Sequence, residues 1–140
     1  MFWDIGGIMR KFSLLALFIS LFAIFAVAQE TSDPLAEYKW IARPLVIFAD
    51  SPFDPRFVLQ MEMLAEDPAI LEERDVVILT DTDVAAYGPL RQRLRPYEFT
   101  VVLLDKEGSV VLRKSTPWTP RELSRAIDKL PIRKDEIDRL

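Results

Sequence analysis

The stretch from Pro44 to Arg56 constrains the fold of this chain more than any other. Five consecutive apolar residues, Leu45 to Ala49, are followed by a polar turn and then by Asp54-Pro55. An unbroken apolar run bounded by prolines is typical of a strand that is buried on both faces of a sheet. Asp54 suits the N-cap of a helix, and Pro55 suits its first position because proline lacks an N–H that would be unpaired there. The stretch therefore predicts a central strand that leads directly into a helix.

The first 28 residues have the organisation of a secretory signal peptide. Two basic residues precede an apolar run from Phe12 to Val27, and the run ends in small residues up to Ala28. This order of charged, apolar and small residues predicts cleavage after Ala28, which would leave Gln29 as the mature N-terminus. An uncleaved membrane anchor is the alternative, because the run is just long enough to cross a bilayer. Either outcome predicts a periplasmic or secreted domain.

The composition excludes several classes of chemistry. The chain has 22 acidic and 18 basic residues, and an acidic balance argues against binding to nucleic acid or to an anionic membrane surface. Membrane contact is expected only through the N-terminal segment, if it is not cleaved. The chain contains no cysteine, so thiol oxidoreductase and peroxidase reactions are not available to it. It also contains no histidine, which removes the usual base of a nucleophilic triad and the commonest metal ligand. We expect no metal and no cofactor.

The remaining elements follow from apolar periodicity and from turn signals. Residues 29–43 form a linker with a short helix, in which Trp40 is expected to pack at the edge of the core, as is Trp118 later in the chain. Asp105 to Gly108 has the composition of a hairpin turn, and Thr119 to Glu122 has the pattern of a capping box. The pattern predicts strands at 45–49, 76–79, 99–104 and 110–112, helices that begin at Pro55, Pro68 and Pro120, a short helix at 88–95 with Arg91, Arg93 and Arg95 solvated, and a charged tail at 132–140.

The order of these elements predicts an α/β fold. Strand, helix, strand, short helix, strand, hairpin, strand and helix is the order of the thioredoxin core, a three-layer α/β/α sandwich. We expect this domain over residues 44–131, with a four-stranded mixed sheet in the order second, first, third, fourth. The first two strands would run parallel through a right-handed crossover. A ferredoxin-like sandwich is the alternative, and it would make all neighbouring strands antiparallel.

Four short motifs accompany the predicted elements: Ala49-Asp50-Ser51, Asp54-Pro55-Arg56, Glu73-Arg74-Asp75 and the closing segment from Leu130 to Lys134. With them the chain resembles thioredoxin and peroxiredoxin relatives, and more closely the thioredoxin-like domain-of-unknown-function family 4174, over about residues 35–133. That family comprises small exported bacterial proteins and also occurs as a module in animal extracellular-matrix proteins. The resemblance implies export and a thioredoxin-like fold, but no established activity.

The same resemblance shows what the chain lacks. The position of the Cys-x-x-Cys pair of catalytic thioredoxins is occupied by the segment from Phe53 to Arg56, and Phe99 stands where a proline usually precedes the third strand. Neither phenylalanine nor arginine can form a thiolate. The resemblance therefore implies a thioredoxin-like domain without redox chemistry.

The candidate site lies where the first strand meets its helix. Asp50, Ser51, Asp54 and Arg56 belong to this turn, and Asp81 follows the neighbouring strand. Ligands of open α/β sheets bind in the crevice outside the carboxyl ends of parallel strands, so we expect these five residues to form a binding site. A weak calcium site that includes Asp81 is a further, less favoured possibility.

Two functions remain compatible with these residues. In the first, Asp54 only caps the helix, Arg56 pairs with Asp50 or Glu62, and the domain is a non-catalytic binding module whose partner is an envelope or extracellular protein. In the second, Arg56 and the first-turn amides bind an anion, and the domain is a small-ligand binder or a non-redox enzyme. A concave pocket that contains both Arg56 and Asp81 would favour the second function.

Overall fold

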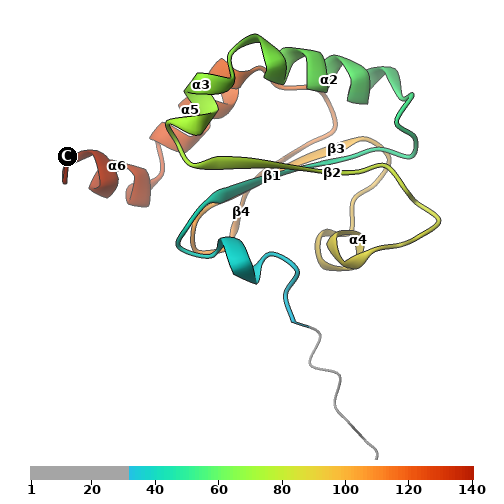
Figure 1. The fold of residues 1–140 in the computed structure, drawn as a ribbon, viewed down its shortest axis with the longest axis horizontal. Coiled ribbons are helices and arrows are strands. Elements are labelled where there is room, and N and C mark those ends of the chain that lie inside the picture. Colours follow the sequence, from blue (N-terminus) through green and yellow to red (C-terminus); the bar gives the residue numbers. More distant parts are fainter. Residues whose placement is uncertain (1–31) are drawn as a thin grey trace, which may run out of the picture. The chain divides into compact units, whose positions relative to one another are not determined.

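A four-stranded mixed sheet organises the domain (Figure 1). The computed structural model describes residues 32–140, so the predicted cleavage site between Ala28 and Gln29 lies outside the described residues. The strands are β1 (Arg43–Phe48), β2 (Val76–Asp81), β3 (Thr100–Leu104) and β4 (Val110–Lys114), in the order β2-β1-β3-β4. β1 and β2 are parallel, whereas β1–β3 and β3–β4 are antiparallel. The predicted order is therefore confirmed, and the parallel pair is incompatible with the ferredoxin-like alternative.

Helices cover both faces of this sheet and make three layers. On one face lie α2 (Pro55–Glu66), α3 (Pro68–Glu72) and α5 (Pro120–Asp128). On the other face lie α4 (Pro89–Leu94) and the short 3-10 helix η1 (Ala36–Tyr38). The final helix, α6 (Pro131–Ile137), follows α5 after a single turn. The helices at Pro55, Pro68 and Pro120 begin where the sequence predicts, each with a proline that needs no N–H partner at its first position. Asp54 and Thr119 cap their helices through the side chain, whereas Asp67 makes no side-chain cap bond.

The core is divided into two clusters by β1, whose six residues are all buried. Leu45 and Ile47 pack with residues of α2, α3 and α5, whereas Val46 and Phe48 pack with residues of α4 and of the segment before β1. Alternate side chains of a strand point to opposite faces, so a strand covered on both faces must be apolar throughout. This confirms the prediction from the apolar run.

Local signals also held at the hairpin and at the last capped helix. Gly108 has a φ of +90°, which a residue with a side chain rarely adopts, and its N–H donates to the carbonyl of Asp105. Thr119 accepts the backbone N–H of Glu122, and the Glu122 carboxylate accepts the N–H of Thr119 in return. The capping box therefore fixes the start of α5.

Three predictions of burial were wrong. The apolar run from Val76 to Leu79 predicts a buried strand, but at the sheet edge, where the predicted order places β2, Ile78 is 38% exposed. Trp40 was expected to pack at the core edge, but it is 62% exposed, because its backbone adopts a left-handed φ of 65° where the chain turns into β1. Arg91 was expected to be solvated, but it is 4% exposed. The burial of Arg91 depends on a partner that is distant in the sequence, since it donates to Ala49 across 42 residues.

The end of the chain is more structured than the predicted charged tail. α6 begins at Pro131, and its Arg133 is buried. Arg133 pairs with Glu136 one turn later, and Glu136 also accepts a hydrogen bond from Arg43 of β1. The contact between Arg43 and Glu136 spans 93 residues and attaches the helix to the domain, and apolar periodicity does not report it. No helix within residues 32–140 is long and apolar enough to cross a membrane.

Candidate functional site

The loop between β1 and α2 is built from its own hydrogen bonds. The Ser51 hydroxyl accepts the N–H of Phe53 at 3.1 Å, and the Ser51 carbonyl accepts the N–H of Asp54 at 3.2 Å. The Asp54 carboxylate then caps α2 by accepting the N–H of Arg56 at 2.8 Å. Serine and aspartate occur here because their short side chains can reach backbone amides two residues ahead. The turn is therefore fixed without any contribution from a ligand.

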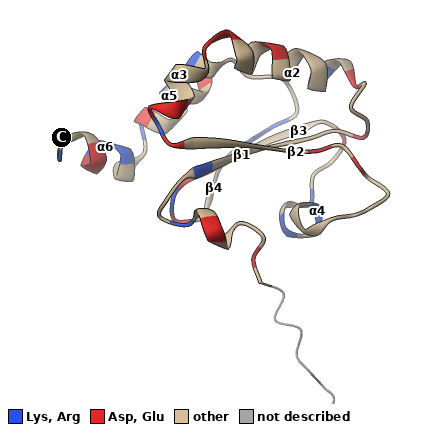
Figure 2. Ribbon diagram, viewed as in Figure 1, with Lys and Arg blue, Asp and Glu red and all other residues tan. Residues whose placement is uncertain are grey.

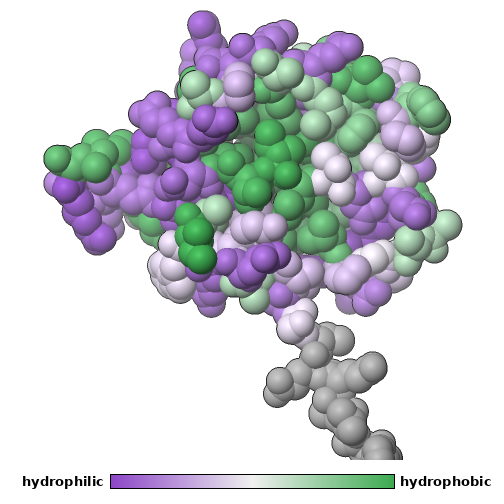
Figure 3. All heavy atoms as spheres, viewed as in Figure 1, coloured by the Kyte–Doolittle hydropathy of each residue, from purple (hydrophilic) through white to green (hydrophobic). Residues whose placement is uncertain are grey.

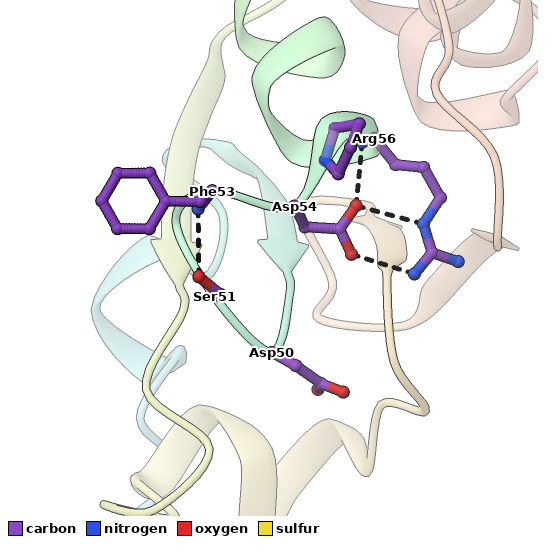
Figure 4. A pocket seen from close by; sticks show the side chains of 6 residues that line it. Asp50, Ser51, Phe53, Asp54 and Arg56 are labelled. Carbon is purple, nitrogen blue, oxygen red and sulfur yellow. Dashed lines mark hydrogen bonds and ion pairs between the residues drawn. The ribbon is translucent and has the colours of Figure 1, made fainter.

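Arg56 binds the capping carboxylate rather than Asp50 or Glu62, so the expected partners of this arginine were wrong. Its Nε donates to Oδ1 of Asp54 at 3.2 Å and its Nη2 donates to Oδ2 at 2.9 Å, so that the guanidinium and the carboxylate meet side by side (Figure 4). Asp54 is close enough because it precedes the helix by one residue and its side chain is already directed at the first turn. Glu98, from the loop before β3, approaches the same guanidinium at 3.6 Å.

This pairing fixes the charge of the site. The hydrogen bond from Arg56 lowers the pKa of the Asp54 carboxyl below its ordinary value. Asp54 therefore stays ionised at neutral pH and cannot act as a general acid. Arg56 also stacks over the ring of Phe99, with its central carbon 5.5 Å from the ring centroid. A residue held by a carboxylate on one side and by a ring on the other is positioned for packing more than for catalysis.

Asp81 and Asp50 take no part in this pair. Asp81 accepts a hydrogen bond from Nε of Arg91 at 2.9 Å, and the same arginine donates to the carbonyl of Ala49 at 2.6 Å. Arg91 thus connects the ends of β1 and β2 from α4. Asp50 is exposed and points away from Asp54 in Figure 4. The predicted five residues therefore separate into the Asp54–Arg56 pair with Ser51, an exposed Asp50, and an Asp81 that is held by Arg91.

Sequence reasoning missed Arg91, although it is the most buried charge of this region. Arginine occupies every second position from 91 to 95. Such a run is typical of a solvated segment when the neighbouring sequence offers no acidic partner. On a helix such residues point in different directions, and only Arg91 faces the sheet. The available signal for the burial of Arg91 was Asp81 at the end of β2, because a buried arginine needs a carboxylate partner.

Two shallow hollows meet at Asp50. The first is lined by the β1–α2 loop and Arg56, and the second lies between α4 and the loop before β3. Three aromatic side chains stand at these hollows and are largely in solvent: Phe53 is 86% exposed, Tyr97 is 80% exposed and Tyr87 is 56% exposed. Neither hollow contains both Arg56 and Asp81. We call the surface formed by Asp50, Phe53, Tyr87 and Tyr97 the carboxyl-end surface.

Strained backbone is concentrated beside the second hollow. Tyr87, Arg95 and Glu98 all line it, and each has a φ between 43° and 47°. Residues with side chains rarely adopt this left-handed conformation, and those that do are often found near binding sites. Arg95 has this conformation as the C-cap of α4, where a left-handed residue ends the helix.

A metal site is not formed by the described acidic residues. Within residues 32–140 no three acidic side chains come together as metal ligands. One carboxylate oxygen of Asp81 accepts a hydrogen bond from Arg91, and the Asp83 carboxylate accepts the N–H of Ala86 at 3.1 Å. The calcium site that the sequence left open therefore lacks a set of free, converging oxygens.

The fold and the site together define a thioredoxin-like domain in which an aspartate–arginine pair lies at the start of α2. Residues 34–136 match the model of a family described as a domain of unknown function (DUF4174), and the chain belongs to this family. No curated protein sequence matches the chain.

Solved structures agree on the fold. The reduced 2-Cys peroxiredoxin of Plasmodium vivax superposes with a TM-score of 0.57 at 14% identity, over 74% of this chain and 84% of that protein. A structure described as a malarial protein superposes with a TM-score of 0.50 at 16% identity, over 63% of this chain and 96% of that chain. At these identities the likeness establishes the fold alone.

Proposed function

We propose that this domain is a non-catalytic binding module of the cell envelope that contacts a protein partner through its carboxyl-end surface. The observation that carries the proposal is the exposure of Phe53, Tyr87 and Tyr97 around two hollows that share Asp50. Large aromatic rings on a surface leave apolar area in water, and aromatic residues are enriched in the centres of protein interfaces. The proposed location in the envelope depends on the signal peptide that the sequence predicts.

Catalysis is a weaker explanation of the same surface. The Asp54–Arg56 pair satisfies both of its charges, and hydrogen bonding stabilises the ionised form of Asp54. Arg56 is already paired with Asp54 and approached by Glu98 at 3.6 Å, so an anion bound there would face two carboxylates. The hydrogen bonds of Arg56 to Asp54 and of Arg91 to Asp81 are charge-assisted, and a ligand that replaced either carboxylate would cost them, so these groups favour a structural role. The small-ligand alternative is therefore second.

Site-specific photocrosslinking in intact producing cells would test the binding function. A benzophenone amino acid would replace Phe53 or Tyr97 at the carboxyl-end surface, and Ile137 of α6, which is 48% exposed, would serve as the matched control. We expect discrete protein adducts of the exported chain from positions 53 and 97 and none from position 137. Adducts of equal yield from all three positions, or from none, would contradict the proposal.

Fractionation and N-terminal mass spectrometry of the same cells would test the location. We expect the chain in the envelope fraction with Gln29 as its first residue. Recovery of the uncleaved chain from the cytoplasm would contradict the envelope function, independently of the crosslinking result.

A further inference from the structure

The outer edge of β2 is unpaired within the described residues. β2 forms a ladder with β1 alone, and it is the first strand of the sheet. The N–H of Arg43 donates to the carbonyl of Asp75, and the N–H of Ala49 donates to the carbonyl of Asp81. Because the ladder alternates along a strand, these two bonds direct the backbone of the odd-numbered residues towards β1. The N–H and C=O groups of Val76, Ile78 and Thr80 therefore face outward.

This edge is also apolar. β2 begins with four consecutive aliphatic residues from Val76 to Leu79, and Ile78 is 38% exposed. Figure 3 shows apolar residues gathered across the middle of the face along which β2 runs in Figure 1. A flat, apolar strand with free backbone groups is a template for pairing with another chain.

The opposite edge of the sheet, formed by β4, is protected against pairing with another chain. β4 ends in Arg113 and Lys114, and its register with β3 is interrupted between Leu103 and Leu104. Charges and register irregularities are common devices by which proteins prevent pairing at an edge. Arg113 also extends to the carbonyl of Leu94 and donates to it at 2.7 Å. From Val76 to Leu79, β2 has no charge, no proline and no interruption.

We propose that the β2 edge binds an extended segment of a partner protein as a fifth strand, with apolar residues in alternation and basic residues at its ends. The charges around β2 support basic ends. Asp75 precedes the strand and stays half exposed although Lys106 pairs with one of its oxygens, and the exposed Asp83 follows two residues after the strand ends. Asp81, the last residue of β2, is already held by Arg91 and does not contribute. A strand that pairs with β2 would bring its own ends next to Asp75 and Asp83. This surface is separate from the carboxyl-end surface, and the inference goes beyond the proposed function.

A second copy of the chain fits this edge poorly. In antiparallel self-pairing, the register with the largest overlap places Ile78 opposite its own copy, and Asp75 then lies opposite Asp81 at both ends. Sliding by two residues places Asp75 opposite Asp83, or Asp81 opposite Glu73. Like charges in directly opposed positions destabilise a strand pair. Each of these three registers, which have the longest overlap, brings acidic residues together, and this favours a basic partner over a dimer.

A peptide probe can test this pairing by NMR with the isotope-labelled exported chain. The probe is acetyl-Lys-Val-Thr-Val-Thr-Val-Lys-amide, and two matched controls carry N-methyl groups on either the valines or the threonines. Only one of these two sets of amides can face β2, because the backbone groups of a strand alternate in direction. We expect shifts at the amides of Val76, Ile78 and Thr80, and a loss of affinity of about tenfold or more for one control only.

Variants of the chain locate the binding. Ile78→Lys should weaken binding about tenfold or more, whereas Val110→Lys on the β4 edge should leave it unchanged, although Val110 is 44% exposed. Thr80→Pro is a second block, because it removes an outward N–H that the β1 ladder does not use. Both β2 variants must keep the circular dichroism spectrum of the parent chain. If Ile78→Lys or Thr80→Pro changes that spectrum, Ile78→Pro takes its place, since it also removes an outward N–H of β2.

Four results would overturn the proposal: no binding, equal binding of the parent peptide and both controls, slow hydrogen exchange at Ile78 and Thr80 in the free chain, or a dimer in sedimentation that Ile78→Lys dissociates. Slow exchange would mean that residues of the chain itself already cover the edge. A dissociable dimer would mean that a second copy is the occupant. Fast exchange of these amides in a monomeric chain, with the single-control loss described above, would support it.

Discussion

The two ends of β1 differ in how they treat charge. Arg43, its first residue, has a buried guanidinium, whereas Asp50, two residues after its last one, has an exposed carboxylate. Arg43 is fully buried and donates to the carbonyl of Arg74 at 2.8 Å and to the carboxylate of Glu136 at 3.0 Å. Lys106, from the β3–β4 turn, reaches the same carboxylate at 2.9 Å. Asp50, at the other end, is exposed.

The two ends also differ in how far apart their partners lie in the sequence. Arg43 and Glu136 are separated by 93 residues, and Arg74 and Asp128 by 54. Figure 2 shows residues of both signs around the start of β1, α5 and α6. At the carboxyl end, Asp54 and Arg56 are two residues apart. Partners that are distant in sequence are brought together only by folding, whereas a pair within one turn is already close in the unfolded chain.

This difference separates stability from binding. The charge network that links β1, α5, α6 and the β3–β4 turn lies at the end opposite the exposed aromatic residues. The β1–α2 turn at the carboxyl end is held by local bonds, so changes in this turn should cost little of the free energy of unfolding. Arg91, which donates to Ala49 across 42 residues, is a long-range contact at this end. The following predictions test this separation.

The largest effect is expected where the buried cation loses its carboxylate. Glu136→Ala should lower the free energy of unfolding by about 3 kcal/mol, because Arg43 stays buried without its main counter-charge. Urea denaturation would measure this loss. Asp135→Ala, at an exposed position of the same helix, is the control and should change stability by less than about 0.5 kcal/mol. Similar values for the two variants would contradict a structural role for the network.

The pH dependence of stability should originate at the same end. Burial of Glu136 opposes its ionised form, but hydrogen bonds from Lys106 and Arg43 outweigh this and lower its pKa to about 2 from an ordinary 4.5. The folded state therefore binds the proton less readily than the unfolded state. The stabilisation is complete above the unfolded pKa and is lost as the pH falls through the folded one.

Between pH 6 and pH 3, Glu136 alone should account for a loss of about 2 kcal/mol in the free energy of unfolding. Asp128 adds to this loss, because the hydrogen bond from Arg74 lowers its pKa. Urea titrations across this range would compare the parent chain with Glu136→Gln, which should show a shallower slope. Parallel slopes would mean that Glu136 titrates alike in both states.

The smallest effect is expected at the carboxyl end. Asp54→Ala should lower the urea midpoint less than Glu136→Ala does, because it removes one helix cap and a partly exposed ion pair. Asp54→Asn should fall between Asp54→Ala and the parent chain, since asparagine still accepts the N–H of Arg56 but has no charge. A midpoint for Asp54→Ala below that of Glu136→Ala would reverse the proposed division between the two ends.

Much of the fold could be predicted because its signals are local. The apolar run from Leu45 to Ala49 predicted a strand covered on both faces, and Asp54 predicted the start of α2. The composition of Asp105 to Gly108 predicted the hairpin. Each signal depends on a few neighbouring residues, whose side-chain pattern and backbone preferences act before tertiary contacts form.

The candidate site could be predicted only in its location. The turn after β1 was identified, but the partner of Arg56 and the burial of Arg91 were not. The direction of a long charged side chain depends on which carboxylate folding brings near it. For Arg91, sequence spacing does not contain that information, because its partners Ala49 and Asp81 come from other segments. For Arg56 the partner was local, but Asp54 was assigned only the role of a helix cap.

By itself, the amino-acid sequence determined the class of this protein: an α/β domain without cysteine or histidine, and therefore without thiol chemistry or a histidine base. Tertiary structure alone decided that Arg43 and Arg91 are buried and that Phe53, Tyr87 and Tyr97 stand in solvent. The reason is physical. Backbone preference and apolar periodicity act over a few residues, whereas burial and ion pairing depend on which distant segments come to lie side by side.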